Sequence, residues 1–408
     1  MKLETQTNLH TLYLCYFGLR EPLVQTQVLP YLREIAKGAI TVSLLTFEPQ
    51  LSERWSAAQI EETRKDLIID GIDWHCLLYH KRPTLPATLF DVFNGARFAL
   101  SLNRRAKIHV LHARTHVPLM MALIVKALTG CRLIFDIRGL VAEEYSDAGV
   151  WRENSLPFRL VKRIERLGLK HAEQIVVLTH KMKNYLVANN LKPAENIEVV
   201  PCCVDFSRVR ESNQENARKA ERFELIYAGS VTGLYLLEEM GRFFLELQKQ
   251  VPRAFFRVLT VSPPANMVET FARLGINQDD FAVQAVSPNQ VPGFVRRARL
   301  AISFRKSTFS QIAASPTKIP EYLAVGVPVI ANSGIGDMDE LLENTKVGVM
   351  LKNFDSDSLR QAVADALKLL ADETLAERCV KTATANFDLT TVGGKNYLNV
   401  YQKIAARF

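Results

Sequence analysis

The chain has 408 residues, of which 48% are apolar and 23% charged, and its formal net charge is +8. This composition excludes a wholly disordered polymer, and the length favours two globular domains. Six cysteines without a Cys-x-x-Cys pair argue against structural zinc and a disulfide framework, and the longest apolar stretch, 117–125, is too short to cross a bilayer.

The first half of the chain alternates short aliphatic runs with segments of helical periodicity. This alternation is typical of a parallel sheet covered by helices. We expect it to form an N-terminal Rossmann-like domain over residues 1–205. The predicted strands are 11–16, 40–47, 72–78, 108–111, 132–137 and 175–178, and the predicted helices are 24–36, 57–70, 88–102, 117–128 and 158–171.

The second half repeats the scheme, which predicts a second Rossmann-like domain over residues 206–385. We expect residues 386–408 to form a C-terminal helix that packs back on the first domain. The fold class is therefore α/β, with two Rossmann-like domains facing each other across a cleft that receives the carboxyl ends of their strands. The predicted strands are 223–228, 255–259, 281–283, 300–304, 327–331 and 347–351, and the helices are 236–250, 266–274, 316–324 and 356–370.

Charged side chains follow two strands of the first half. Arg114-Thr115-His116 ends one strand, and Asp136 ends the next, with Arg138 two residues later. We expect these side chains to face the cleft. Arg138 is a candidate contact to a sugar or phosphate, oriented by Asp136, and His116 is a candidate sugar contact. The alternative is an Asp–Arg pair that closes a loop.

Three histidines, at 109, 112 and 116, invite a metal interpretation. Side chains alternate along a strand, so spacings of three and four do not converge on one ion. We therefore expect no metal site here.

The segment from Ser315 to Ile330 reads as a helix, a glycine stop and a buried strand. Ser315 suits the N-cap and Pro316 the first helical position, followed by Thr317 and Lys318. The free amides of a first helical turn, the helix dipole and a lysine make an anion site. Glu321 shares a helix face with Lys318, so a capped helix with a local Lys–Glu pair is the alternative.

This segment resembles the donor site of family 4 of the retaining glycosyltransferases, which have the GT-B fold, and in particular a subgroup with a Ser-Pro-Thr-Lys pattern. The resemblance implies that Lys318 lies near the diphosphate of a nucleotide sugar and that Glu321 holds the ribose hydroxyls. The family often carries two Glu residues in this motif. Glu321 matches the second, and the first lies eight residues before it. That position is Ala313 here, so backbone groups of residues 313–315 would replace the missing carboxylate.

Other segments carry the same resemblance. Gly229-Ser230 is similar to the family's turn over the diphosphate, and Gly18 lies where relatives have a glycine that lets the backbone approach donor and acceptor. Asp136 and Arg138 stand in a Phe-Asp-Ile-Arg-Gly motif similar to that of one subgroup. The family's usual basic residues after the Gly-Ser turn are missing, which makes Arg305 a candidate helper for Lys318.

The resemblance implies a retaining, metal-independent glycosyltransferase that needs no cofactor beyond its nucleotide-sugar donor. The expected acceptor is a glycan or lipid-linked saccharide of bacterial polysaccharide synthesis, and no nucleic acid is expected. Two alternatives are a nucleotide-sugar 2-epimerase of the same fold and a protein that binds anionic polymers. The latter would use residues 101–200, which hold 16 Lys and Arg against 9 Asp and Glu.

The N-terminus lacks the layout of a signal peptide, so we expect a cytoplasmic protein. The predicted helix 158–171 combines basic and apolar positions. Such a helix suits an anionic membrane surface, which would place the protein at the inner face of the cell membrane. A packed helix with a solvated basic face is the alternative.

Overall fold

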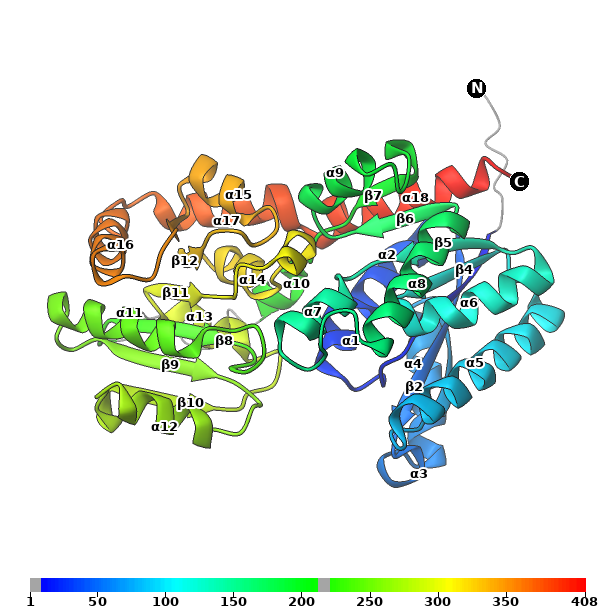
Figure 1. Cartoon of the computed structure of the whole chain (residues 1–408), viewed down its shortest axis with the longest axis horizontal. Helices are drawn as coiled ribbons and strands as arrows, with labels where there is room; N and C mark the ends of the chain where they lie inside the picture. The colour runs from blue at the N-terminus through cyan, green and yellow to red at the C-terminus, as the bar shows by residue number, and fades with distance from the viewer. Residues whose placement is uncertain (1–8, 212–220) are drawn as a thin grey trace. The chain divides into compact units, whose positions relative to one another are not determined.

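The computed structural model describes residues 9–211 and 221–408. These residues form two compact units (Figure 1). Unit 1 comprises the described residues up to Ala142 together with Trp151–Val200 and Gly393–Phe408. Unit 2 comprises Glu143–Val150 and the described part of Pro201–Val392. The chain therefore passes between the units four times. The sequence pattern predicted only two borders, near residues 205 and 385.

Unit 1 is built on a seven-stranded parallel sheet with the order β3-β2-β1-β4-β5-β6-β7. Apart from the edge strand β3, the strands are almost continuously buried, as expected of a parallel sheet with helices on both faces. The strand order reverses between β1 and β4, which makes that edge the ligand position in folds of this class. The strands are β1 His10–Cys15, β2 Thr41–Pro49, β3 Ile72–Tyr79, β4 Val110–Arg114, β5 Arg132–Asp136, β6 Gln174–Val177 and β7 Ile197–Val199.

The predicted helix 24–36 is wrong in one respect, because it is two helices. Val28 has φ −125° and ψ −65°, which is not helical, and it separates α1 from α2. A proline lies at the first or second helical position of each of the two helices. The helices of unit 1 are α1 Pro22–Gln27, α2 Leu29–Lys37, α3 Leu51–Arg54, α4 Ala57–Ile69, α5 Thr84–Ala106, α6 His116–Thr129, α8 Leu156–His171, α9 His180–Ala188 and α18 Lys395–Ala405, while α7 Val141–Asp147 crosses into unit 2.

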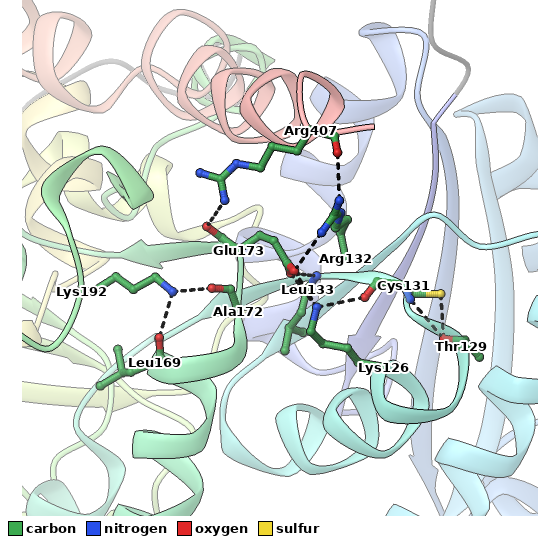
Figure 2. A network of polar contacts seen from close by, with 10 residues as sticks. All are labelled: Lys126, Thr129, Cys131, Arg132, Leu133, Leu169, Ala172, Glu173, Lys192 and Arg407. Atoms are coloured by element: carbon green, nitrogen blue, oxygen red, sulfur yellow. Dashed lines mark hydrogen bonds and ion pairs between the residues drawn. The ribbon is translucent and has the colours of Figure 1, made fainter.

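The C-terminal segment is fastened to unit 1 by a polar network at the sheet (Figure 2). Glu173 accepts hydrogen bonds from Lys126 Nζ at 2.6 and 2.9 Å and from the backbone N–H of Leu133 at 2.7 Å. Arg132 donates to the carbonyl oxygen of Arg407 at 2.9 Å. The segment after α18 thus closes over the beginning of β5.

Unit 2 contains a six-stranded parallel sheet with the order β10-β9-β8-β11-β12-β13. Its order reverses between β8 and β11, so the loops after these two strands mark the expected ligand position. The strands are β8 Glu224–Ala228, β9 Phe255–Leu259, β10 Phe281–Gln284, β11 Leu300–Ser303, β12 Val329–Asn332 and β13 Gly348–Leu351. The helices are α10 Phe206–Glu211, α11 Leu237–Gln250, α12 Ala265–Arg273, α13 Val291–Arg297, α14 Lys318–Ala324, α15 Met338–Thr345, α16 Ser356–Leu369 and α17 Leu375–Phe387.

Each face of this sheet carries its own apolar core. Leu225 and Tyr227 point to one face and pack with α11 and α16, whereas Ile226 and Ala228 point to the other and pack with α14 and α17. The alternation of side chains along a strand produces this division. In the part of the chain that the structure covers, no helix combines the length and the apolarity needed to span a bilayer.

Candidate functional site

The turn after β8 brings backbone and an ammonium group together. Gly229 has φ +140°, in the region that favours glycine. A Cβ placed there would lie 2.9 Å from Lys318 Nζ and 3.0 Å from its Cε. Glycine at this position therefore lets the ammonium group lie directly against the turn.

Lys318 is held in place by two tyrosines. Its side chain is 5% exposed, and its Nζ donates a hydrogen bond to Tyr227 Oη at 2.9 Å. The same Nζ lies 3.8 Å from the ring centroid of Tyr235, within the range of a cation–π interaction. Tyr227 Oη donates in turn to the carbonyl oxygen of Ser230. The lysine is thus tied to the Gly229-Ser230 turn.

A second cation shares the Tyr235 ring. Arg305 follows β11, and its Cζ lies 5.1 Å from the ring centroid of Tyr235. Asn332, at the end of β12, fixes the Arg305 backbone by accepting from its N–H at 2.8 Å and donating to its carbonyl oxygen at 2.9 Å. Two cations, Arg305 and Lys318, thus share one tyrosine ring at the edge where the strand order reverses.

The two cations lack a neutralising carboxylate at close range. Burial, and then the charge of Arg305, hold the pKa of Lys318 well below its ordinary value. Across residues 9–211 and 221–408 neither cation forms an ion pair within 4.0 Å, and the buried Nε of Arg305 has no hydrogen-bond partner. A buried polar atom without a partner calls for an explanation, and a bound anion would supply one.

The start of α14 differs from the prediction. Lys318 is the first helical residue and Thr317 the N-cap, without a side-chain cap. Ser315 does not cap the helix, because its Oγ accepts from the backbone N–H of Cys202 at 3.1 Å. Ser315, Pro316 and Thr317 therefore form the approach to the helix, and the Lys318 side chain is the positive feature that the structure displays.

Glu321 pairs with an arginine that the sequence did not suggest. Arg208 Nη2, on α10, donates to Glu321 Oε1 at 2.7 Å. Burial raises the pKa of Glu321, and Arg208 opposes that rise. The alternative of a local Lys318–Glu321 pair is therefore not what the structure shows, because each residue has its own partners. A separation of 113 residues left no signal in the sequence for the Arg208 contact.

A buried amide lies near the position where relatives carry their first Glu. Ala313 is 1% exposed and ends the short 3₁₀ helix Phe309–Ala313. Gln311, within the same turn, is fully buried, and its Oε1 has no hydrogen-bond partner in the described part of the chain. Its backbone oxygen accepts from Gly336 N at 2.8 Å, so it adjoins the glycine-rich turn after β12.

The loop after β11 also binds the segment Glu143–Val150, which lies between two parts of unit 1 in the sequence. Thr308 Oγ1 donates to Asp147 Oδ2 at 2.6 Å, and Lys306 Nζ donates to the Asp147 carbonyl oxygen at 3.2 Å. These bonds explain why Glu143–Val150 belongs to unit 2. The Arg305 loop is thereby fixed on both sides.

In unit 1, Asp136 is the centre of a buried polar cluster. It is fully buried, and Tyr397 Oη donates to its Oδ2 at 2.8 Å. Arg114, Arg138 and His112 each place a nitrogen 3.7 Å from its carboxylate. Burial alone would raise its pKa, but Arg138 and the other neighbours lower it to about 2. The predicted Asp136–Arg138 pair is present, yet the carboxylate is enclosed rather than open.

His116 follows the end of β4, as predicted, but its side chain is buried. His116 is the first residue of α6 and is 4% exposed. Its Nε2 lies 3.3 Å from Glu165 Oε2 on α8, and its ring meets Phe135 edge-on. The ring is therefore part of the packing between helices and sheet. No group of three metal-ligating side chains occurs among the residues that the structure describes.

Gly18 lies against a buried carboxylate at the end of β2. Glu48 is 1% exposed, and its Oε1 accepts from the backbone N–H of Leu19 at 2.8 Å. A Cβ on Gly18 would lie 2.9 Å from Glu48 Oε2. Burial raises the pKa of Glu48. Gly18 therefore allows the loop to close over Glu48, a residue that the sequence did not single out.

Comparison with known proteins shows what this architecture resembles. Residues 24–203 match the model of the glycosyl transferase 4-like domain, and residues 210–386 match that of glycosyl transferases group 1. No curated protein sequence matches the chain. The solved structures of sucrose-phosphate synthase from Thermosynechococcus elongatus and a glycosyltransferase from Rickettsia africae are similar, with TM-scores of 0.71 and 0.70 and identities of 13% and 14%.

For both of these proteins the match covers 98% of this chain and 100% of the other. Anabaena HepE, solved in complex with UDP and glucose, is similar at a TM-score of 0.64 and 15% identity, over 97% of this chain and 98% of HepE. At such identities the likeness establishes the fold, which is GT-B.

Proposed function

Because the chain belongs to the group 1 glycosyltransferases with a GT-B fold, we propose that it moves a sugar from a nucleotide-diphosphate donor to a hydroxyl acceptor with retention of configuration. The acceptor we propose is a glycan or a lipid-linked saccharide. The donor site is the cationic turn of unit 2, formed by Gly229, Ser230, Arg305 and Lys318.

One observation carries this proposal: two cations, Lys318 at the turn and Arg305 on the same Tyr235 ring, have no carboxylate within 4.0 Å in the described residues. A diphosphate is a fitting counterion, since its two negative charges would meet an ammonium and a guanidinium group. Negative charge grows on the leaving diphosphate as the glycosidic bond breaks. Preorganised cations at that point stabilise the transition state more than the ground state.

The neighbouring side chains suit the rest of the donor. Glu321, oriented by Arg208, would accept hydrogen bonds from the ribose hydroxyls. The unpartnered Oε1 of Gln311 would accept from a hydroxyl of the transferred sugar, in place of the carboxylate that Ala313 lacks. No metal is required in this scheme, because the cations neutralise the leaving group. In unit 1, we assign Arg138 to a donor contact with Asp136 as its positioning residue, while Gly18 gives access to the backbone.

The test is transfer activity of a Lys318→Met variant, measured with a panel of uridine, guanosine and adenosine diphosphate sugars. We expect kcat/KM to fall by two to three orders of magnitude, as when one donor to a developing oxyanion is removed. Lys249→Met on α11 is the matched control, because it removes an exposed lysine that pairs with Glu246. Wild-type activity of the Lys318 variant would refute the assignment.

The same assay separates the alternatives by their products. A 2-epimerase would convert the nucleotide sugar without an acceptor, whereas a transferase releases nucleoside diphosphate in proportion to glycosylated acceptor. The anomeric proton of the product, read by NMR, tests retention. Inverted product would discard the retaining mechanism while leaving the donor site intact.

A further inference from the structure

Three helices of unit 1 form a continuous outer layer over one face of its sheet. Figure 1 shows α5, α6 and α8 side by side, with α6 packed against both neighbours. Glycines allow the close approach: a Cβ on Gly95 of α5 would lie 2.6 Å from Met121 Sδ, and one on Gly168 of α8 would lie 2.5 Å from Leu119. The outward side chains of these helices therefore share one surface, which we call the α5-α6-α8 face.

The charge of this face has one sign. The carboxylates of the three helices are Asp91 and Glu165, which are 0% and 5% exposed. Asp91 pairs with His80 at 2.6 Å, and Glu165 pairs with Lys162 at 2.5 Å. The face also carries exposed basic side chains, none of which forms an ion pair within residues 9–211 and 221–408: Arg97, Arg104, Arg105, Arg159, Arg163, Arg166 and Lys170.

The same face exposes large apolar side chains from all three helices. Phe93 on α5 is 66% exposed, Leu128 on α6 is 68% exposed, and Leu156 on α8 is 76% exposed. Leu89, Ile124 and Leu160 add to them one or two turns away. Single exposed apolar residues are ordinary, but a set spread over adjacent helices marks an interaction surface.

Two other surface helices, α4 and α16, carry a mixed charge. In unit 1, α4 mixes Glu61, Glu62 and Asp66 with Arg64 and Lys65. In unit 2, α16 likewise alternates acidic and basic residues. The unpaired cations gathered on the α5-α6-α8 face thus contrast with the mixed charges of α4 and α16.

We propose that the α5-α6-α8 face docks on an anionic lipid bilayer. Its cations would meet the headgroups, and Phe93, Leu128 and Leu160 would enter the boundary with the acyl chains. The apolar component decides for a bilayer, because a nucleic acid needs cations alone and gains little from exposed leucines. This inference stands apart from the proposed function, since it concerns where the protein works and not which donor it uses.

The test is co-flotation with phosphatidylcholine vesicles that contain either no or about 30% phosphatidylglycerol. Wild-type protein is expected to float with the anionic vesicles only and to be released by salt. The double variant Arg163→Glu, Arg166→Glu should weaken the partition coefficient about 25-fold or more, at roughly five-fold per cation lost. The matched control, Arg360→Glu with Lys368→Glu on α16, makes the same change in net charge and should bind like wild type.

A second variant isolates the apolar contribution. Phe93→Ser with Leu128→Ser keeps every cation and should lose binding to vesicles while its weak binding to a single-stranded oligonucleotide is unchanged. Wild-type protein that ignores anionic vesicles, or equal losses in the α8 and α16 variants, would overturn the proposal. Oligonucleotide binding that exceeds vesicle binding would also overturn it. Nucleoside diphosphate binding should be unaffected by either surface variant, so a failure of the donor-site proposal would be seen separately.

Discussion

The close approach of Lys318 to Gly229 provides a sharp test of the donor site. In a Gly229→Ala variant the new Cβ would lie 2.9 Å from Lys318 Nζ. The lysine is enclosed by Tyr227 and Tyr235 and has little room to yield. We expect the ammonium group to be pushed off the turn and its contact with a phosphate oxygen to be lost.

The magnitude follows from the interaction removed. A hydrogen bond between charged partners contributes about 1.5–3 kcal/mol, which corresponds to roughly 10- to 150-fold weaker binding. Backbone strain at φ +140° adds about 1–3 kcal/mol to the loss of folding stability. The effect on binding should therefore be separable from the effect on unfolding.

Gly233→Ala is the matched control. Gly233 lies four residues further along the same loop, at φ +75°, and a Cβ there would meet no atom within 4 Å. It incurs backbone strain without touching Lys318. Calorimetric titration with the best-binding nucleoside diphosphate would compare the two variants. Equal affinities would show that Lys318 does not contact the diphosphate, and our account of the site would be wrong.

Further predictions concern the two buried clusters. Burial lowers the pKa of Lys318, and a bound phosphate would raise it again, so binding should take up protons. This uptake would appear as a dependence of the binding heat on the ionisation enthalpy of the buffer. The affinity should fall as pH rises from the depressed pKa toward about 10.5. Tyr397→Phe should lower the free energy of unfolding by about 1.5–3 kcal/mol in urea titrations, because Asp136 loses a buried hydrogen bond. The pKa of Asp136 in the folded protein is about 2, below its unfolded value, so Asp136 should stabilise the fold fully above about pH 4 and lose that contribution as pH falls toward 2. The difference in urea midpoint between wild type and Asp136→Asn should therefore shrink over this range. A difference that does not change with pH would contradict the assignment.

The sequence predicted what depends on local pattern. Periodicity located the strands, because buried parallel strands are short, aliphatic and flanked by turns. It failed at Val28, whose non-helical backbone divides a pattern that looks continuous, and at Ser315, whose hydroxyl accepts from the Cys202 backbone instead of capping a helix. Local patterns cannot reveal a partner that arrives from elsewhere in the chain.

The candidate site shows the same division. Gly229 and Lys318 were predicted from motif position and lie against each other, and Arg305, predicted as a helper for Lys318, shares the Tyr235 ring with it. Arg208 was missed because its partner, Glu321, lies 113 residues away in the chain. Glu48 was missed because only the fold buries it and brings it to Leu19. Burial itself, which shifts the pKa of Lys318 and of Glu48, has no signature in a short stretch of sequence.

The return of α18 to unit 1 has a consequence for how the protein is made. Tyr397 and Tyr401 form hydrogen bonds with Asp136, Thr11 and His112, although all of unit 2 separates them in the chain. During translation, a nascent unit 1 must leave the ribosome with that polar cluster uncovered until residues after Val392 emerge. An isolated fragment ending near Val200 should therefore depend on chaperones, and supplying residues 393–408 as a separate peptide should restore its solubility.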